Sequence, residues 1–219
     1  MAKKAKTRAR KGGPRPGADS AATRDAIFAA AAEAFSRRGF DGVVVDDIAR
    51  DAGVNKAMIY YHFTDKLALY REIVRDMLRH VGGAVTAIAA SDATPEQKIA
   101  RWIETFVTIG EQRPYFPPML MREIAEGAPH LDTDTFSGMR AVLGAFAQIL
   151  AEGQKRGVFR PVHPVLAYIS LVAPLMFNAA RERAAAQPGR DGFPMFVELS
   201  HAELTRHMQH VALKMLAKD

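Results

Sequence analysis

Hydrogen-bonding side chains are concentrated between positions 55 and 66, where the sequence reads NKAMIYYHFTDK. Lysine donates hydrogen bonds to O6 and N7 of guanine, asparagine pairs with the edge of adenine, and a methionine side chain contacts the methyl group of thymine. Tyrosine hydroxyls and lysine ammonium groups also bind phosphate oxygens, which positions a protein on a duplex without reading its sequence. These residue types therefore favour non-covalent recognition of nucleic acid, provided that a short helix presents them outward.

The residues before this segment predict that such a helix follows a sharp turn. We expect one helix over 46–52 and a second over 55–61, with Asn55 as the N-cap of the second. Two helices cross closely only where the contacting side chain is small, as at Ala49, and the chain reverses quickly only where one position tolerates positive φ, as Gly53 does. This pattern is typical of a helix-turn-helix, whose second helix enters the DNA major groove. A plain αα-hairpin shares some of these features and is the alternative.

Residues 23–77 resemble the DNA-binding domain of the tetracycline-repressor (TetR) family of transcriptional regulators. The matching residues, in the family's order and spacing, are Ala31, Phe35, Gly39, Phe40, Asp47, Ile48, Ala49, Ala52, Gly53, Val54, Tyr60, Tyr61, His62, Phe63, Lys66 and Leu69. By this resemblance the residues that face the operator are Asn55, Lys56, Ala57, Met58 and Tyr61. The phosphate contacts that it implies are Tyr60, His62 and Lys66.

The sequence departs from the family pattern at three sites, one of which comprises two residues. Family members usually carry Thr or Ser where the helix over 46–52 begins, but Val44 and Val45 occupy that place and have no hydroxyl to cap the helix or meet phosphate. Asp46 follows, and its carboxylate is a candidate cap for the helix but is expected to repel a nearby phosphate. Met58 replaces a frequent Thr. We therefore expect an unusual DNA site, or weaker affinity from the helix-turn-helix alone.

The first 18 residues carry seven Lys or Arg side chains and no acid. The net charge is +6, so the rest of the chain sums to −1. With almost no large apolar side chain, residues 1–19 are expected to be a disordered basic arm that adds phosphate or minor-groove contacts. A solubilising leader is the alternative.

Composition narrows the remaining function classes. The chain has no cysteine, no secretory signal and no apolar run long enough to cross a bilayer, which favours a cytoplasmic protein without disulfides. It lacks a P-loop, a GxGxxG motif, a serine nucleophile elbow and HExxH, so we expect no cofactor and no enzyme. His207 and His210 share a helix face but are expected to be ordinary surface histidines and not a metal site.

The spacing of apolar residues predicts an all-α chain of about nine helices. The expected helices cover 20–38, 46–52, 55–61, 64–90, 94–111, 118–126, 132–156, 163–186 and 195–217, the fifth beginning with the capping box Thr94–Pro95–Glu96–Gln97. We divide the chain into a DNA-binding domain at 20–65 and a domain at 66–219 for ligand sensing and dimerisation.

The helices over 163–186 and 195–217 are apolar over more of their circumference than one core requires. The resemblance implies that they pair with a second copy as a four-helix bundle, and a two-fold dimer reads a near-palindromic operator. The alternative is that the two helices bury only each other.

Large, adaptable side chains recur through the second domain. Some are expected to line a pocket for a small apolar or aromatic effector that releases the protein, as a repressor, from DNA. The candidates are Trp102, Phe106, Phe116, Met119, Leu120, Phe136, Met139, Leu143, Phe146, Met176 and Phe177. Taken one by one, each is also explained as core. A rival interpretation is a helical small-molecule-binding protein with weak or vestigial DNA binding.

Overall fold

The computed structural model describes residues 16–185 and 199–218, and across these two ranges it has nine helices and no strand, which confirms the all-α prediction. The helices are α1 (Pro16–Arg38), α2 (Val45–Asp51), α3 (Lys56–His62), α4 (Lys66–Ala90), α5 (Pro95–Gln112), α6 (Phe116–Ala125), α7 (Thr133–Lys155), α8 (Pro164–Ala185) and α9 (His201–Leu216). The expected basic arm lies outside the described residues except at 16–19, where the backbone already belongs to α1.

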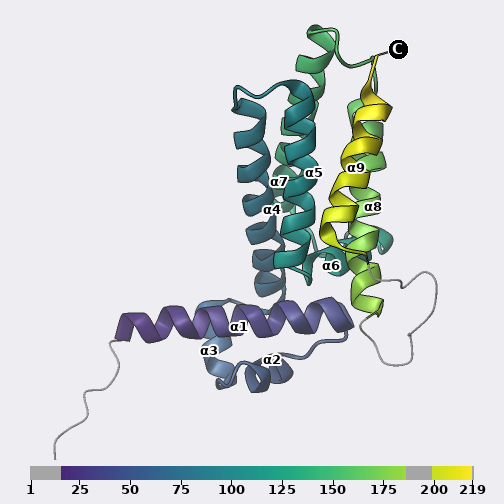
Figure 1. The fold of residues 1–219 in the computed structure, drawn as a ribbon. Helices are drawn as coiled ribbons and strands as arrows, with labels where there is room; N and C mark the ends of the chain where they lie inside the picture. The colour runs from purple at the N-terminus through teal and green to yellow at the C-terminus, as the bar shows by residue number, and fades with distance from the viewer. Residues whose placement is uncertain (1–15, 186–198, 219) are drawn as a thin grey trace, which may run out of the picture.

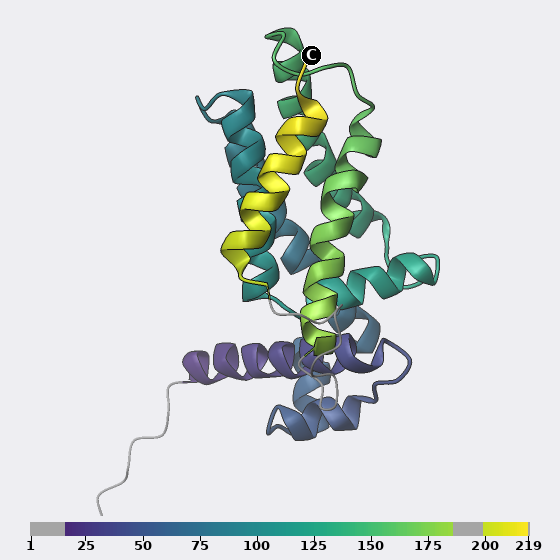
Figure 2. The same cartoon turned by 45° about the vertical axis from the view of Figure 1, so that its right-hand side comes forward.

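The helices form a small N-terminal unit and a tall bundle (Figure 1). In that unit α1 runs across the foot of the bundle, with α2 and α3 on its far side, while α4, α5, α7, α8 and α9 stand upright. The short helix α6 lies where the two units meet, and it contacts α1, α4 and α8. Figure 2 shows the C-terminus at the opposite end from α2 and α3.

An aromatic cluster joins the N-terminal unit to the bundle. The ring of Tyr70, in α4, packs edge-on against Phe35 and Phe40, with centroids 5.0 and 5.3 Å away. Phe35 and Tyr70 are almost completely buried. Edge-to-face aromatic pairs of this kind add roughly 0.5–1.5 kcal/mol to the free energy of burial, so α1 is held firmly on α4.

Most helix starts carry the side-chain caps that their sequences indicate. Asn55 accepts a hydrogen bond from the backbone N–H of Met58, and Thr94 and Gln97 form both halves of the predicted capping box. Two helices in the described part of the chain begin without a side-chain cap, α2 after Val44 and α6 after Tyr115. The last helix begins at His201 behind a second capping box, Ser200–Glu203, so its expected start near 195 was wrong.

The turn between α2 and α3 depends on Gly53, which has φ +67° and open space where a Cβ would lie. The left-handed conformation costs other residues about 1–2 kcal/mol, so we predict that Gly53→Ala lowers the free energy of unfolding by about 1 kcal/mol. The matched control is Gly83→Ala in α4, where a Cβ also meets nothing within 4 Å but the backbone is helical. Gly83→Ala should raise the free energy of unfolding by roughly 0.5–1 kcal/mol. Chemical denaturation followed by circular dichroism measures both, and equal signs would contradict the argument.

Candidate DNA-reading surface and effector cavity

The helix α3 presents most of its predicted contact residues to solvent. Tyr60 is 47% exposed and Tyr61 is 75% exposed, while Ile59 is fully buried and fixes the helix against the core. Asn55, Lys56 and Ala57 are also exposed at the start of the helix. Because the side-chain oxygen of Asn55 accepts the cap hydrogen bond at 3.0 Å, it is already engaged.

Two predicted contact residues lie partly inside the protein. Met58 packs half-buried against the core, so less of its side chain faces outward than the sequence suggested. His62 is also half-buried, with its ring 5.0 Å from that of Tyr61. Its buried Nε2 has no hydrogen-bond partner in the described part of the chain.

The cation at the start of α3 has a protein anion beside it. Lys56 Nζ lies 2.9 Å from Oδ2 of Asp46, across the gap between α3 and α2. The hydrogen bond and charge of Asp46 raise the pKa of Lys56 above its ordinary value. Asp46 does not cap α2, so the expectation that it is the cap was wrong. Its carboxylate instead binds the ammonium group that would otherwise contact guanine or phosphate.

Lys66 is engaged by the protein as well. Its ammonium group donates to the carbonyl oxygens of Phe40 at 3.1 Å and Val43 at 3.0 Å, and it lies 4.1 Å from the centre of the Phe40 ring. These contacts tie the start of α4 to the loop between α1 and α2. A phosphate bound by Lys66 would have to share its ammonium group with these two carbonyl oxygens, and the contacts observed here position the helix-turn-helix.

Sequence reasoning missed a charged clamp on α2. The carboxylate of Asp47 lies 2.6 Å from Arg38, at the end of α1, and 2.9 Å from Arg50, near the end of α2. The hydrogen bond from Arg38, followed by that from Arg50, holds the pKa of Asp47 below its usual range. The clamp fixes α2 on α1 and leaves Arg50 largely exposed.

A cavity of about 300 Å³ lies between α4, α5, α6, α7 and α8. Seven of the predicted pocket residues line it, namely Phe106, Phe116, Leu120, Phe136, Met139, Leu143 and Met176. Sequence reasoning missed the other lining residues, which are Leu78, Val81, Arg140, Val142, Tyr168 and Val172. The volume is at the lower end of the range of small-molecule sites, roughly 300–1,000 Å³.

Four predicted pocket residues lie elsewhere. Trp102, Met119 and Phe146 are almost completely buried and belong to the core, where the Trp102 ring lies 4.3 Å from that of Phe106 and 4.9 Å from that of Phe146. Phe177 is 51% exposed on the outer side of α8. Size and helical spacing predicted all four as pocket residues. Residues of the core, of the cavity wall and of the outer helix face have the same size and spacing, so the sequence does not distinguish these places.

A buried carboxylate joins α6 to α4 between the cavity and the N-terminal unit. Glu123 is 2% exposed, and its oxygens accept a hydrogen bond from Tyr70 Oη at 2.9 Å and lie 2.7 Å from His130 Nδ1. Burial, followed by this hydrogen bond, raises the pKa of Tyr70, which therefore remains a donor. The His130 ring in turn lies 4.1 Å from that of Phe40.

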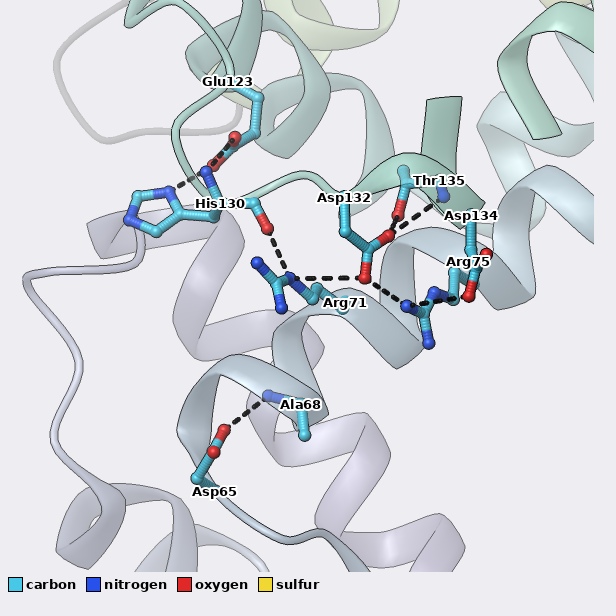
Figure 3. A network of polar contacts seen from close by, with 9 residues as sticks. All are labelled: Asp65, Ala68, Arg71, Arg75, Glu123, His130, Asp132, Asp134 and Thr135. Atoms are coloured by element: carbon cyan, nitrogen blue, oxygen red, sulfur yellow. Dashed lines mark hydrogen bonds and ion pairs between the residues drawn. The ribbon is translucent and has the colours of Figure 1, made fainter. Parts of the chain in front are cut away.

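The network continues to the start of α7 (Figure 3). Arg71 donates to the carbonyl of His130 at 2.7 Å, and Arg75 pairs with Asp132, the N-cap of α7. Burial alone would raise the pKa of Asp132, but hydrogen bonds from Thr135 and the charge of Arg75 lower it. Polar contacts thus tie α4 to α6 and to the start of α7.

Comparison with known families agrees with this geometry. Residues 27–73 match the family described as bacterial regulatory proteins of the tetR family, and residues 95–188 match the tetracyclin repressor-like C-terminal domain. The regulator RutR of Escherichia coli K12 is 29% identical over 143 residues, covering 65% of this chain and 67% of RutR. The repressor BepR of Brucella suis is 33% identical over 149 residues, covering 64% of this chain and 70% of BepR.

Solved structures share the fold over most of the chain. KstR2 of Mycobacterium tuberculosis, a ketosteroid transcriptional regulator, has a TM-score of 0.72 at 18% identity, covering 90% of this chain and 95% of KstR2. PfmR of Thermus thermophilus has a TM-score of 0.69 at 24% identity, covering 88% of this chain and 99% of PfmR. The family consists of transcriptional regulators and not of enzymes. The helix-turn-helix, the helical second domain and these matches establish that the chain belongs to the TetR family of DNA-binding transcriptional regulators.

Proposed function

We propose that the protein is a cytoplasmic repressor that binds a near-palindromic operator as a homodimer and leaves it when a small, largely apolar effector enters the cavity. Residues 20–65 read DNA, and residues 66–219 sense the effector and form the dimer. The observation that carries this proposal is the construction of α4. One end holds the reader through Lys66 and Tyr70, and Leu78 and Val81 further along line the cavity.

The reading surface is the exposed side of α3. Lys56, Ala57 and Tyr61 face outward at spacings that let a short helix meet base edges in the major groove. Tyr60 and His62 contact phosphate on this proposal, and basic residues 1–15 add attraction that carries no sequence information. Repression, as opposed to activation, is supported by the naming of BepR as a repressor.

The dimer is supported by the outer face of α8. Leu166, Ile169 and Phe177 are more than half exposed, although large apolar side chains normally avoid water. The stretch Pro164–Glu182 is apolar and long enough to cross a bilayer, so the expectation that the chain has no such run was wrong, and only 28% of it is buried within one copy. A second copy buries the same face, and the resulting two-fold axis places two α3 helices on one operator.

Release follows from the contacts of α6. This helix carries Phe116 and Leu120 in the cavity wall, and three residues beyond Leu120 it carries Glu123, which is bonded to Tyr70 in α4. A ligand that moves α6 therefore moves α4, and with it the separation of the two readers. Such coupling between sites usually amounts to about 1–3 kcal/mol, or a 5- to 150-fold change in affinity.

One alternative has a specific observation in its favour. Asp46 occupies Lys56, and no hydroxyl caps α2 at Val44, so the reader lacks two features that favour DNA. A helical small-molecule-binding protein with weak DNA binding would account for both. Band-shift with DNA flanking its own coding region distinguishes the two functions, because only a regulator forms a complex that survives competitor DNA.

The role of α3 is tested with Lys56→Ala on the DNA bound in that experiment. We predict a roughly ten- to hundred-fold loss of preference for the operator over unrelated DNA, because a lysine pairing with guanine supplies discrimination of this size. Fluorescence anisotropy measures both affinities, and sedimentation should find the dimer intact. The control is Lys155→Ala, which removes an exposed lysine at the end of α7. An unchanged preference in Lys56→Ala would exclude α3 as the reader.

The pair between Lys56 and Asp46 generates an opposite prediction. Asp46→Asn frees the ammonium group and removes a negative charge near phosphate, so operator affinity should rise about three- to ten-fold, with a steeper dependence on salt. Asp92→Asn is the control, because it makes the same charge change at an exposed site in the loop between α4 and α5. If both variants bind alike, the effect is one of net charge, and the pair does not limit DNA binding.

Filling the cavity should imitate the effector. We predict that Leu143→Phe lowers operator affinity about five- to hundred-fold by pressing on the cavity wall, whereas Ile88→Phe, an enlargement outside the cavity, leaves it within about two-fold. Tyr70→Phe removes one bond to Glu123 and should weaken the response to Leu143→Phe in a double-mutant cycle. Additive effects of the two substitutions would place the coupling elsewhere.

A further inference from the structure

The cavity wall contains one charged side chain, Arg140, among residues that are otherwise almost all apolar. It lies on α7 within the stripe Phe136, Met139, Arg140 and Leu143, whose spacing of three, four and seven residues places all four on one helix face. All four line the cavity. Arg140 therefore brings a positive charge to the apolar face that α7 contributes to the cavity.

Arg140 differs from the arginines nearby in having no partner. Arg71, Arg75 and Arg113 each lie close to an aspartate carboxylate, at the start of α7 or in α4. Within residues 16–185 and 199–218, Arg140 has neither an ion pair nor a hydrogen bond. Because Arg140 lines the cavity and is also exposed to solvent, its guanidinium is available to an anion that enters from outside.

A second donor reaches the same cavity from α8. Tyr168 is half-buried in the wall, and its hydroxyl has no hydrogen-bond partner among the described residues. Burial raises the pKa of Tyr168 to about 12, so the hydroxyl keeps its proton at neutral pH. The polar part of the wall thus offers a cation and a neutral donor, and the described residues supply no anion there.

We propose that the effector is a carboxylic acid with an apolar body, whose carboxylate is bound by Arg140 and Tyr168. This inference rests on the proposed function, because it assigns a ligand class to the same effector site. The planar guanidinium matches a carboxylate with two parallel hydrogen bonds. Phe116, Leu120 and Val172 supply apolar contact for the rest of the molecule, and the volume of about 300 Å³ favours one of modest size.

The test compares three probes with the same ten-carbon chain and different ends: decanoate, decanol and decylamine. Isothermal titration calorimetry with the full-length dimer, below micellar concentrations, measures each dissociation constant. Decanoate should bind about ten-fold or more tightly than decanol, as expected for a charge-assisted hydrogen-bonded end, and decylamine more weakly than decanol. Decanoate should also release the operator in a band-shift.

Variants separate the cavity from the surface. Arg140→Gln should reduce decanoate binding to the level of decanol, Arg140→Lys should restore part of the difference, and Tyr168→Phe should weaken decanoate about three- to ten-fold while sparing decanol. Arg101→Gln is the matched control, because Arg101 is exposed, lies outside the cavity wall and has no partner among the described residues. It should leave all three affinities and operator binding unchanged.

Two results would overturn the carboxylate assignment: equal binding of decanoate and decanol, or failure of all three probes to bind. An unchanged preference for decanoate in Arg140→Gln would do the same. Operator binding without any probe is recorded in parallel. If the unmodified protein binds the operator but gives one of these results, the proposed function stands and only the ligand class is wrong. If the unmodified protein does not bind the operator, the proposed function itself is wrong.

Discussion

The buried carboxylate of Glu123 sets the relation between the two parts of the molecule. At 2% exposure its oxygens need hydrogen-bond partners within the protein, and the structure supplies Tyr70 from α4 and both the ring and the backbone N–H of His130. Removing any of these partners would leave a buried polar group with an unsatisfied hydrogen bond. The carboxylate therefore permits only a narrow range of positions of α6 against α4. Because α1 packs on the same Tyr70 ring, the constraint extends to the DNA-reading unit.

This constraint explains why a local event in the cavity can have a distant consequence. Packed interiors pass from one arrangement to another and do not deform gradually. If α6 shifts, the hydrogen bonds of Glu123 either carry α4 with it or break, and breaking them leaves buried polar groups without partners. Arg75 and Asp132 tie α4 to α7 in the same way. Three helices of the cavity wall are thus connected to the reader through polar contacts at one end.

Features that depend on neighbouring residues were predicted correctly from the sequence. Contacts between residues far apart in the chain were not. Caps at Asn55 and Thr94, and the turn at Gly53, were found because each involves positions within a few residues. The partners of Lys56 and Lys66 were not, because tertiary approach brings them together from 10 to 26 positions away. Trp102 was assigned to the pocket because an apolar stripe does not indicate whether it faces core or cavity. Arg140 was missed although its place within such a stripe was visible, because only apolar members were considered.

Lys56 and Arg140, the cations at the two proposed binding sites, differ in whether the protein already supplies a partner for them. Lys56, on the DNA-reading helix α3, is already paired with the exposed carboxylate of Asp46. The free energy that DNA gains from Lys56 is therefore only the difference between its interaction with DNA and its interaction with that solvated carboxylate. Arg140, at the cavity, has no such competitor within the described chain, and an anion bound there adds an interaction that the empty state lacks. A ligand shifts a conformational equilibrium only by its difference in affinity for the two states. On the proposed function, a lysine already paired with Asp46 and an unpaired arginine together favour a regulator whose affinity for DNA is modest and which an acidic effector releases readily.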